Sequence, residues 1–133
     1  MEIRASVVGD KQVAEALQRA PREVGAEVAR AINWGTTKIA NTAKQDHPYT
    51  DRTANLTNSI GIIPARQAIG NVVGIAQAVM AYAEAVEEGT PPHGDHPGSA
   101  PHPFMGPAKD KHYDDIVRRI EAGADRGLRR TGL

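Results

Sequence analysis

Four histidines in the last third of the chain are the residues best suited to metal chemistry. His93, His96, His102 and His112 fall within twenty residues, with Asp95 among them. Imidazole and carboxylate groups are ligands for zinc and iron, so residues 93–96 could chelate a metal from a loop. Functional metal ligands are usually held by a helix or strand and by an outer layer of hydrogen bonds, whereas these histidines stand among five prolines. We therefore interpret them as solvated side chains and predict no metal site and no cofactor.

The same cluster carries the alternative function, a small metal-dependent hydrolase or nuclease that would use His93, Asp95, His96 and His102. Other signatures of catalysis are missing. The chain has no cysteine, so it has no thiol nucleophile. Residues 70–74 contain no lysine and follow no strand-to-helix pattern, which excludes a phosphate loop, and the serines lack the flanking glycines of a nucleophile elbow. We predict that the protein is not an enzyme.

Acidic residues gather in the segment 84–88, just before the prolines. They could form a carboxylate pair for acid–base work, or simply a solvated helix face. Glu87 and Glu88 stand at the negative end of a short predicted helix, where each costs on the order of a few tenths of a kcal/mol. This pattern favours a compensating charge, and arginines of a neighbouring copy, such as Arg118 and Arg119, are candidates beside plain solvation.

The apolar inventory predicts an oligomer. Of 133 residues, 40% are hydrophobic, but 21 residues are alanine and there is one Phe and one Trp. Large apolar surface contributes about 25 cal/mol per Å² buried, so such a core is thin and would gain from burial against other copies. Sixteen basic and sixteen acidic side chains give no net charge, which removes self-repulsion.

Charge is distributed unevenly along the chain. The formal sums are +2 for residues 1–66, −4 for residues 67–108 and +2 for residues 109–133. A protein that grips a DNA duplex gathers Lys and Arg on one surface, and the gathered run here is Arg126, Arg129 and Arg130. Tight DNA binding is therefore not indicated, although an oligomeric DNA-packaging accessory protein that uses this run is a third interpretation.

Hydrophobic periodicity predicts an α+β domain. The expected elements are a strand near 3–7, a short helix capped by Asp10, a long helix over 21–44, a loop over 46–58, strands over 59–65 and 71–77, a helix over 78–88, a Pro/His-rich loop over 90–103 and a final helix over 107–126. We expect one domain over 1–133, in which the long helix and the C-terminal helix cover a small antiparallel β-sheet, and a basic end over 126–133. No secretory or membrane-spanning segment is predicted.

Three stretches, in this order, carry a resemblance to a known family. Residues 54–60 resemble a Gly-x-Leu-x-x-Ser-Ile signature, residues 82–90 a Tyr-Ala-x-x-Val-Glu-x-Gly-Thr segment, and residues 101–108 a Pro-x-Pro-Phe-Leu-x-Pro-Ala segment. Together they are similar to the neck and tail-completion proteins of long-tailed bacteriophages, a group that includes the minor tail protein Z of phage lambda. Ala54 or Asn55 stands where glycine is usual in that family.

The resemblance implies a structural virion protein that forms a homo-oligomeric ring, expected to be sixfold, at the head–tail junction. Its partners would be further copies of itself, the head-closure connector, and the tail-terminator or tail-tube proteins. Genomic DNA would pass through the lumen without sequence-specific binding, and no membrane is involved. The expected location is the virion, and the host cytoplasm during assembly.

A ring joins identical chains head to tail, so each copy must bury two different patches. The residues that we predict at these assembly contacts are Trp34, Tyr82, Glu84, Glu87, Glu88, Pro103, Phe104, Met105, Arg118 and Arg119. Phe104, the only phenylalanine, is either an interface anchor or a core residue beneath the last helix.

Overall fold

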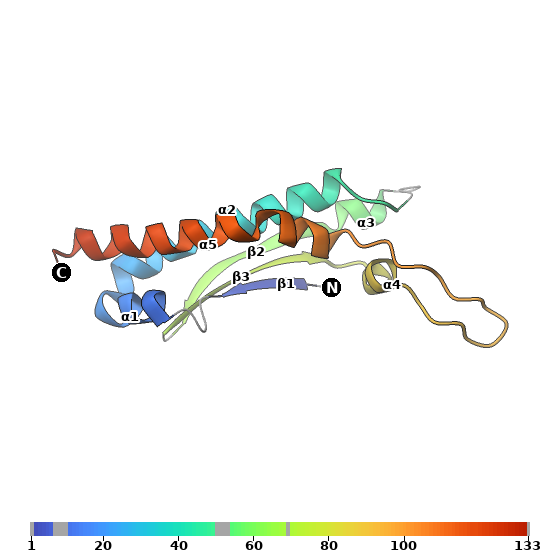
Figure 1. Ribbon diagram of the computed structural model, residues 1–133, viewed down its shortest axis with the longest axis horizontal. Coiled ribbons are helices and arrows are strands. Elements are labelled where there is room, and N and C mark those ends of the chain that lie inside the picture. Colours follow the sequence, from blue (N-terminus) through green and yellow to red (C-terminus); the bar gives the residue numbers. More distant parts are fainter. Residues whose placement is uncertain (1, 7–10, 50–53, 69, 133) are drawn as a thin grey trace.

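A computed structural model describes residues 2–6, 11–49, 54–68 and 70–132 of the protein. The elements follow the order β1 (Glu2–Ser6), α1 (Lys11–Arg19), α2 (Pro21–Gln45), α3 (Asn55–Asn58), β2 (Ile60–Ala68), β3 (Asn71–Ala78), α4 (Ala83–Glu88) and α5 (Met105–Arg130). Figure 1 shows the two long helices above a curved sheet, with a narrow loop extending from α4. The α+β class predicted from the sequence is confirmed.

The sheet has three antiparallel strands in the order β1-β3-β2. Residues alternate in β3 between buried and half-buried positions, and Val72, Gly74, Ala76 and Ala78 lie on the buried face. The β2–β3 register shifts between Ile63 and Arg66. Pro64 lies in that irregularity on an edge strand, where a residue without an N–H is tolerated.

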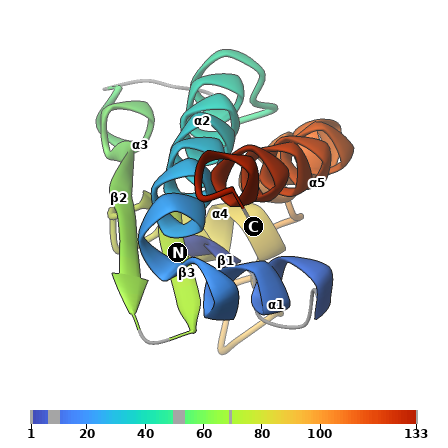
Figure 2. The same cartoon turned by 90° about the vertical axis from the view of Figure 1, so that its left-hand side faces the viewer.

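Helix α2 covers the inner face of the sheet, and α5 packs mainly against α2 (Figure 2). Helix α2 buries one stripe of side chains at helical spacing, as expected for the long helix predicted over 21–44. The stripe consists of Val24, Val28, Ala31, Ile32, Gly35, Ile39 and Ala43. The close approach of the helices requires a glycine in α5. A Cβ at Gly127 would lie 2.6 Å from the Cα of Val24.

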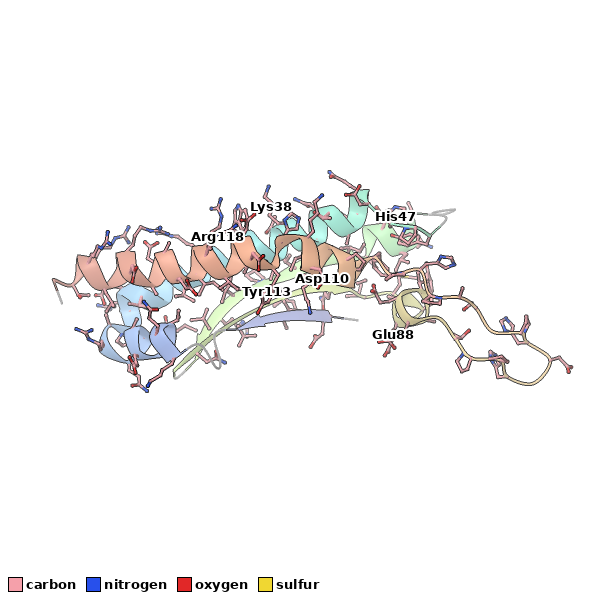
Figure 3. The ribbon with its side chains drawn as sticks, viewed as in Figure 1. Lys38, His47, Glu88, Asp110, Tyr113 and Arg118 are labelled. Atoms are coloured by element: carbon pink, nitrogen blue, oxygen red, sulfur yellow. The ribbon has the colours of Figure 1, made fainter. Side chains whose placement is uncertain are left out.

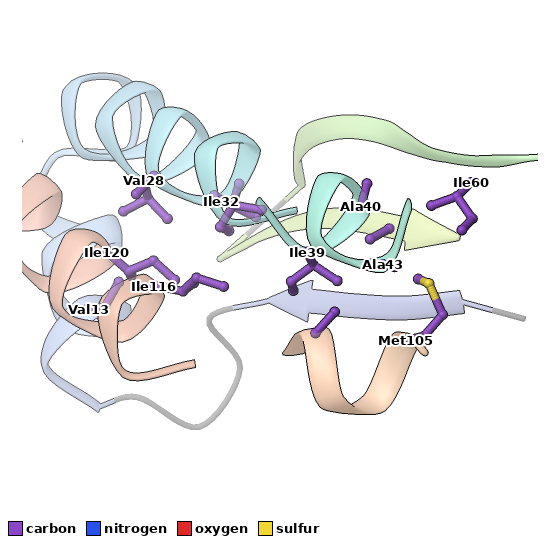
Figure 4. Packing of buried hydrophobic residues seen from close by; sticks show 14 of the residues in the cluster. Val13, Val28, Ile32, Ile39, Ala40, Ala43, Ile60, Met105, Ile116 and Ile120 are labelled. Atoms are coloured by element: carbon purple, nitrogen blue, oxygen red, sulfur yellow. The ribbon is translucent and has the colours of Figure 1, made fainter. Parts of the chain in front are cut away.

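The core lies between the sheet and the helices (Figure 4). Its largest fully buried side chains include Phe104, Ile32, Ile39 and Met105, and alanine is its commonest residue. The core is thus built largely from small side chains, as the composition indicates.

Several element boundaries differ from the sequence prediction. Residues 55–58 form the short helix α3 inside the expected loop, β3 continues to Ala78, and α4 begins only at Ala83. Helix α5 is longer at both ends than expected. The predicted cap Asp10 lies outside the described residues.

Ala54, just before α3, has a φ of 59° and is the one non-glycine residue with positive φ in the described ranges. This left-handed conformation normally favours glycine. Ala54 is one of the two residues, with Asn55, given above as standing in place of the glycine of the resembled signature.

Candidate functional site

The Pro/His-rich loop over 90–103, called the arm below, is a narrow hairpin that projects beyond the sheet and helices (Figure 1). Thr90 pairs with Ser99, and His93 pairs with His96, each through two backbone hydrogen bonds of 2.8–3.0 Å. Residues 91–97 are all exposed. The expected loop contains no helix or strand, and these two isolated bridges give it the shape of a hairpin. The prolines lie beside the two bridges and not in them. The four backbone N–H groups that form the bridges belong to Thr90, His93, His96 and Ser99.

The arrangement at the tip of the arm bears on the metal hypothesis. The rings of His93 and His96 stack with centroids 4.8 Å apart. His96 Nδ1 accepts a hydrogen bond of 2.9 Å from the Gly98 N–H, so a neutral His96 carries its proton on Nε2. A metal needs an unprotonated nitrogen, and in this arrangement His96 offers none.

The remaining members of the histidine cluster are dispersed. His102 lies at the base of the arm, where its backbone N–H donates a hydrogen bond of 2.7 Å to the Val86 carbonyl. His112 lies in α5. Within the described ranges, no group of three or more His, Cys, Asp or Glu side chains is arranged to hold a metal ion.

Glu87 links α4 to the start of α5. Its Oε1 accepts hydrogen bonds from the N–H groups of Phe104 (2.9 Å) and Met105 (2.7 Å), and its Oε2 accepts one from Gly106 (3.2 Å). These donors belong to the positive end of a 26-residue helix, which otherwise leaves them unsatisfied. The compensation that the sequence indicated for Glu87 thus comes from the start of α5 in the same chain, which was neither of the candidates given above.

Phe104 and Met105 are fully buried, so they are not available as interface anchors. The Phe104 ring contacts Tyr49 edge-on, with centroids 5.3 Å apart. The physical reason is the Glu87 carboxylate, which holds the backbone of both residues against the base of the arm. The interface prediction for these two residues is corrected, and the alternative of Phe104 as a core residue holds.

The other predicted contact residues near the arm remain on the surface. Tyr82 is 43% exposed, and Glu84, Glu88 and Pro103 are exposed as well. In Figure 3 the side chain of Glu88 points away from α4 and from the sheet. These residues are free to meet a partner, together with Val79, which is 63% exposed.

The remaining predicted residues meet in a groove between α2 and α5, called the arginine groove below. The guanidinium carbon of Arg119 lies 3.7 Å from the centre of the half-buried Trp34 ring, and Lys38 Nζ lies 5.6 Å from it. Arg118 forms an ion pair with Asp115 one helical turn away. The groove has a volume of about 610 Å³ and is lined by Arg30, Ala31, Trp34, Asp115, Arg118, Arg119, Ala122 and Arg126.

One end of the arginine groove is built on a buried carboxylate that the sequence analysis missed. The Glu27 side chain is 3% exposed and forms ion pairs with Arg30 (3.3 Å), Arg126 (3.3 Å) and Arg130 (2.6 Å). The spacing of Glu27 and Arg30 by three residues is a local signal for such a pair. The other two arginines lie about a hundred residues further along the chain, where no local pattern indicates them.

No protein-family model, curated protein or solved structure matches the chain. Among the described helices, none combines the length and the apolar character needed to cross a membrane.

His112 is the group from which we expect the stability of the α2–α5 contact to depend on pH. Its Nε2 lies 2.6 Å from Thr42 Oγ1. Burial lowers the pKa of His112 below its usual 6.5, with Lys111 and Lys38 adding to the effect and Asp115 opposing it. The neutral ring is thus favoured in the folded state, and this stabilisation is present above pH 6.5 and lost as the pH falls below it.

We expect the free energy of unfolding, measured by urea denaturation, to decrease between about pH 7.5 and pH 5.5. His112→Gln should remove part of this dependence, since glutamine does not titrate. His93→Gln, a change on the exposed arm, should leave the dependence as it is. Equal pH profiles for the wild type and the His112 variant would contradict the assignment.

Proposed function

We propose that this chain is a structural virion protein that assembles into a homo-oligomeric ring at the head–tail junction of a long-tailed phage or a phage-like particle. The main observation that supports the proposal is the arm. Hydrogen bonds to Glu87 fix its base, and it extends away from the sheet and the long helices. Glu87 belongs to one stretch that resembles the family, and Phe104 belongs to another. The two stretches therefore form one structural unit, and Ala54 in the third adopts the conformation that favours glycine.

The surface chemistry is consistent with contacts between copies. A ring requires two unlike patches on each chain. The arm offers one, because a proline-rich hairpin loses little conformational freedom when it is bound. In this proposal the second patch is built from the exposed apolar side chains of Ile63, Val79 and Tyr82. In this proposal the arm of one copy packs on that surface of the next, and no cofactor takes part.

Within the particle, the ring would join the head-closure connector to the tail-terminator or tail-tube proteins around the DNA channel. It would be present in the virion, and in the host cytoplasm before assembly is complete. The ring is expected to be sixfold and to catalyse nothing.

Shortening the arm tests the proposal. Thr90 and Ser99 pair directly, so residues 91–98 can be replaced by Asn-Gly, a two-residue turn that closes such a hairpin. We expect rings of the wild-type chain in negative-stain electron microscopy and light scattering. The shortened variant should remain monomeric with an unchanged melting temperature, because the replaced residues lie outside the core.

Two controls make the result specific. Substituting His93 and His96 by Gln changes the tip of the arm but keeps its length, and rings should persist. A wild-type chain that stays monomeric at millimolar concentration and does not bind phage heads or tails would refute the proposed function.

A further inference from the structure

Part of the charge on α5 is grouped by sign along the helix. Arg119, Arg126 and Arg130 follow one another at intervals of seven and four residues, so they share one flank of the helix. The acidic residues Asp114, Glu121 and Asp125 repeat the same intervals on a flank about 140° away. A face that serves only solubility intersperses the two signs. Asp115 also lies on the arginine flank, so the flank is distinguished by its excess of arginines and not by a complete separation of the two signs.

Residues of α2 extend the positive flank across the arginine groove. Arg30, Arg126 and Arg130 share the single carboxylate of Glu27, which leaves two positive charges in excess. Lys38 and Arg119 at Trp34 add two more, while Arg118 is balanced by Asp115. Figure 3 shows Lys38 and Arg118 on the side of the long helices that faces away from the sheet. A concentration of like charge on an open surface attracts an anion.

We propose that the arginine groove binds the phosphate backbone of nucleic acid. The planar guanidinium fork matches a phosphate group in two hydrogen bonds. From residue 119 to residue 130 the row of arginines extends about 16 Å along α5, at 1.5 Å per residue, so it spans several phosphates of one strand. A single small anion would occupy one end of this row only.

An acidic segment of another protein is the competing occupant. Within this chain, the exposed carboxylates of Glu84, Glu88 and Asp95 are divided between α4 and the tip of the arm, so they do not form a continuous row. A nucleic-acid strand carries its charges at regular short intervals, which fits the row better. The contact recognises phosphate charge and not the bases. Binding is therefore independent of the nucleic-acid sequence and allows the strand to slide.

The only tryptophan of the chain lies in this groove, so it reports on the site directly. The purified full chain is titrated with a labelled 24-base-pair duplex at about 50 mM salt, and fluorescence anisotropy is followed together with Trp34 emission. We expect a dissociation constant on the order of 10⁻⁶–10⁻⁴ M, a change in Trp34 emission at the same concentrations, and weaker binding as salt increases.

Substituting Arg118 and Arg119 by Gln should weaken binding about tenfold or more and reduce the slope of log K against log salt by roughly 2. Neither arginine contacts Glu27, so the fold should be retained, which a thermal melt checks. The matched control substitutes Lys11 and Arg22 by Gln. These residues are exposed, lie outside the groove, and change the net charge equally, so their effect should be at most about twofold to threefold.

Several outcomes would overturn the inference. The first is an equal loss of affinity in the two double variants, and the second is DNA binding without a response of Trp34. The third is equally tight binding of poly-glutamate at the same salt concentration, which would assign the groove to an acidic protein. Inorganic phosphate is titrated in parallel, and saturation in the same concentration range would also count against a polymer. The inference does not rest on the proposed function, because rings that form normally and ignore DNA would refute this proposal alone.

Discussion

Truncation of Phe104 to alanine is expected to lower the free energy of unfolding by about 3–5 kcal/mol. Phe104 is completely buried and is the largest of the fully buried side chains. Its removal leaves a cavity beside Tyr49, whose ring it contacts edge-on. The measurement is chemical denaturation followed by circular dichroism, with the exposed Tyr113→Ala as the control for loss of an aromatic side chain from the surface.

This result would separate the two roles that the sequence left open for Phe104. An interface anchor would weaken self-association on truncation while the isolated chain kept its stability. A core residue lowers the stability of the isolated chain itself. Unfolding midpoints that coincide for the Phe104 variant and the wild type would contradict the burial described above.

The second large effect is expected for Glu87→Ala, which should lower the free energy of unfolding by about 2–3 kcal/mol. The estimate follows from the loss of a helix cap, worth about 0.5–2 kcal/mol, and from the charged character of the hydrogen bonds, which are each worth about 1.5–3 kcal/mol. Three N–H groups at the start of α5 lose their acceptor. Hydrogen exchange at the Met105 amide should accelerate in parallel.

The neighbouring Glu88 provides a matched control, since it is exposed and is not among the acceptors at the start of α5. Glu88→Ala should change the stability by no more than a few tenths of a kcal/mol, and Glu87→Gln should lie between the two because it retains one acceptor oxygen. If both alanine variants had the same stability, Glu87 would not cap α5.

Glu87 also shows how far local patterns reach. The sequence indicated that a negative charge at the end of a helix needs compensation, and this is what the structure contains. The candidates that the sequence offered did not include the backbone N–H groups of residues 104–106, because these lie 17–19 residues further along and the arm brings them back beside α4. No periodic pattern in the sequence predicts that the start of α5 lies beside α4.

The arginine groove is a second case. The intervals between Arg119, Arg126 and Arg130 are visible in the sequence. The only gathered basic run there, Arg126, Arg129 and Arg130, did not indicate tight DNA binding. Trp34 and Lys38 complete the groove from a helix that lies about eighty residues earlier in the chain. A net charge summed over a long segment does not show which charged residues lie close together in the folded chain.

Periodicity alone was enough to identify α2, the β2–β3 hairpin and the α+β class, because the period of buried side chains follows directly from helix and strand geometry. The burial of Phe104, the capping of α5 by Glu87 and the meeting of Arg119 with Trp34 needed the folded chain. Burial and charge interactions depend on distance through space, and folding brings together residues whose separation along the chain carries no such information.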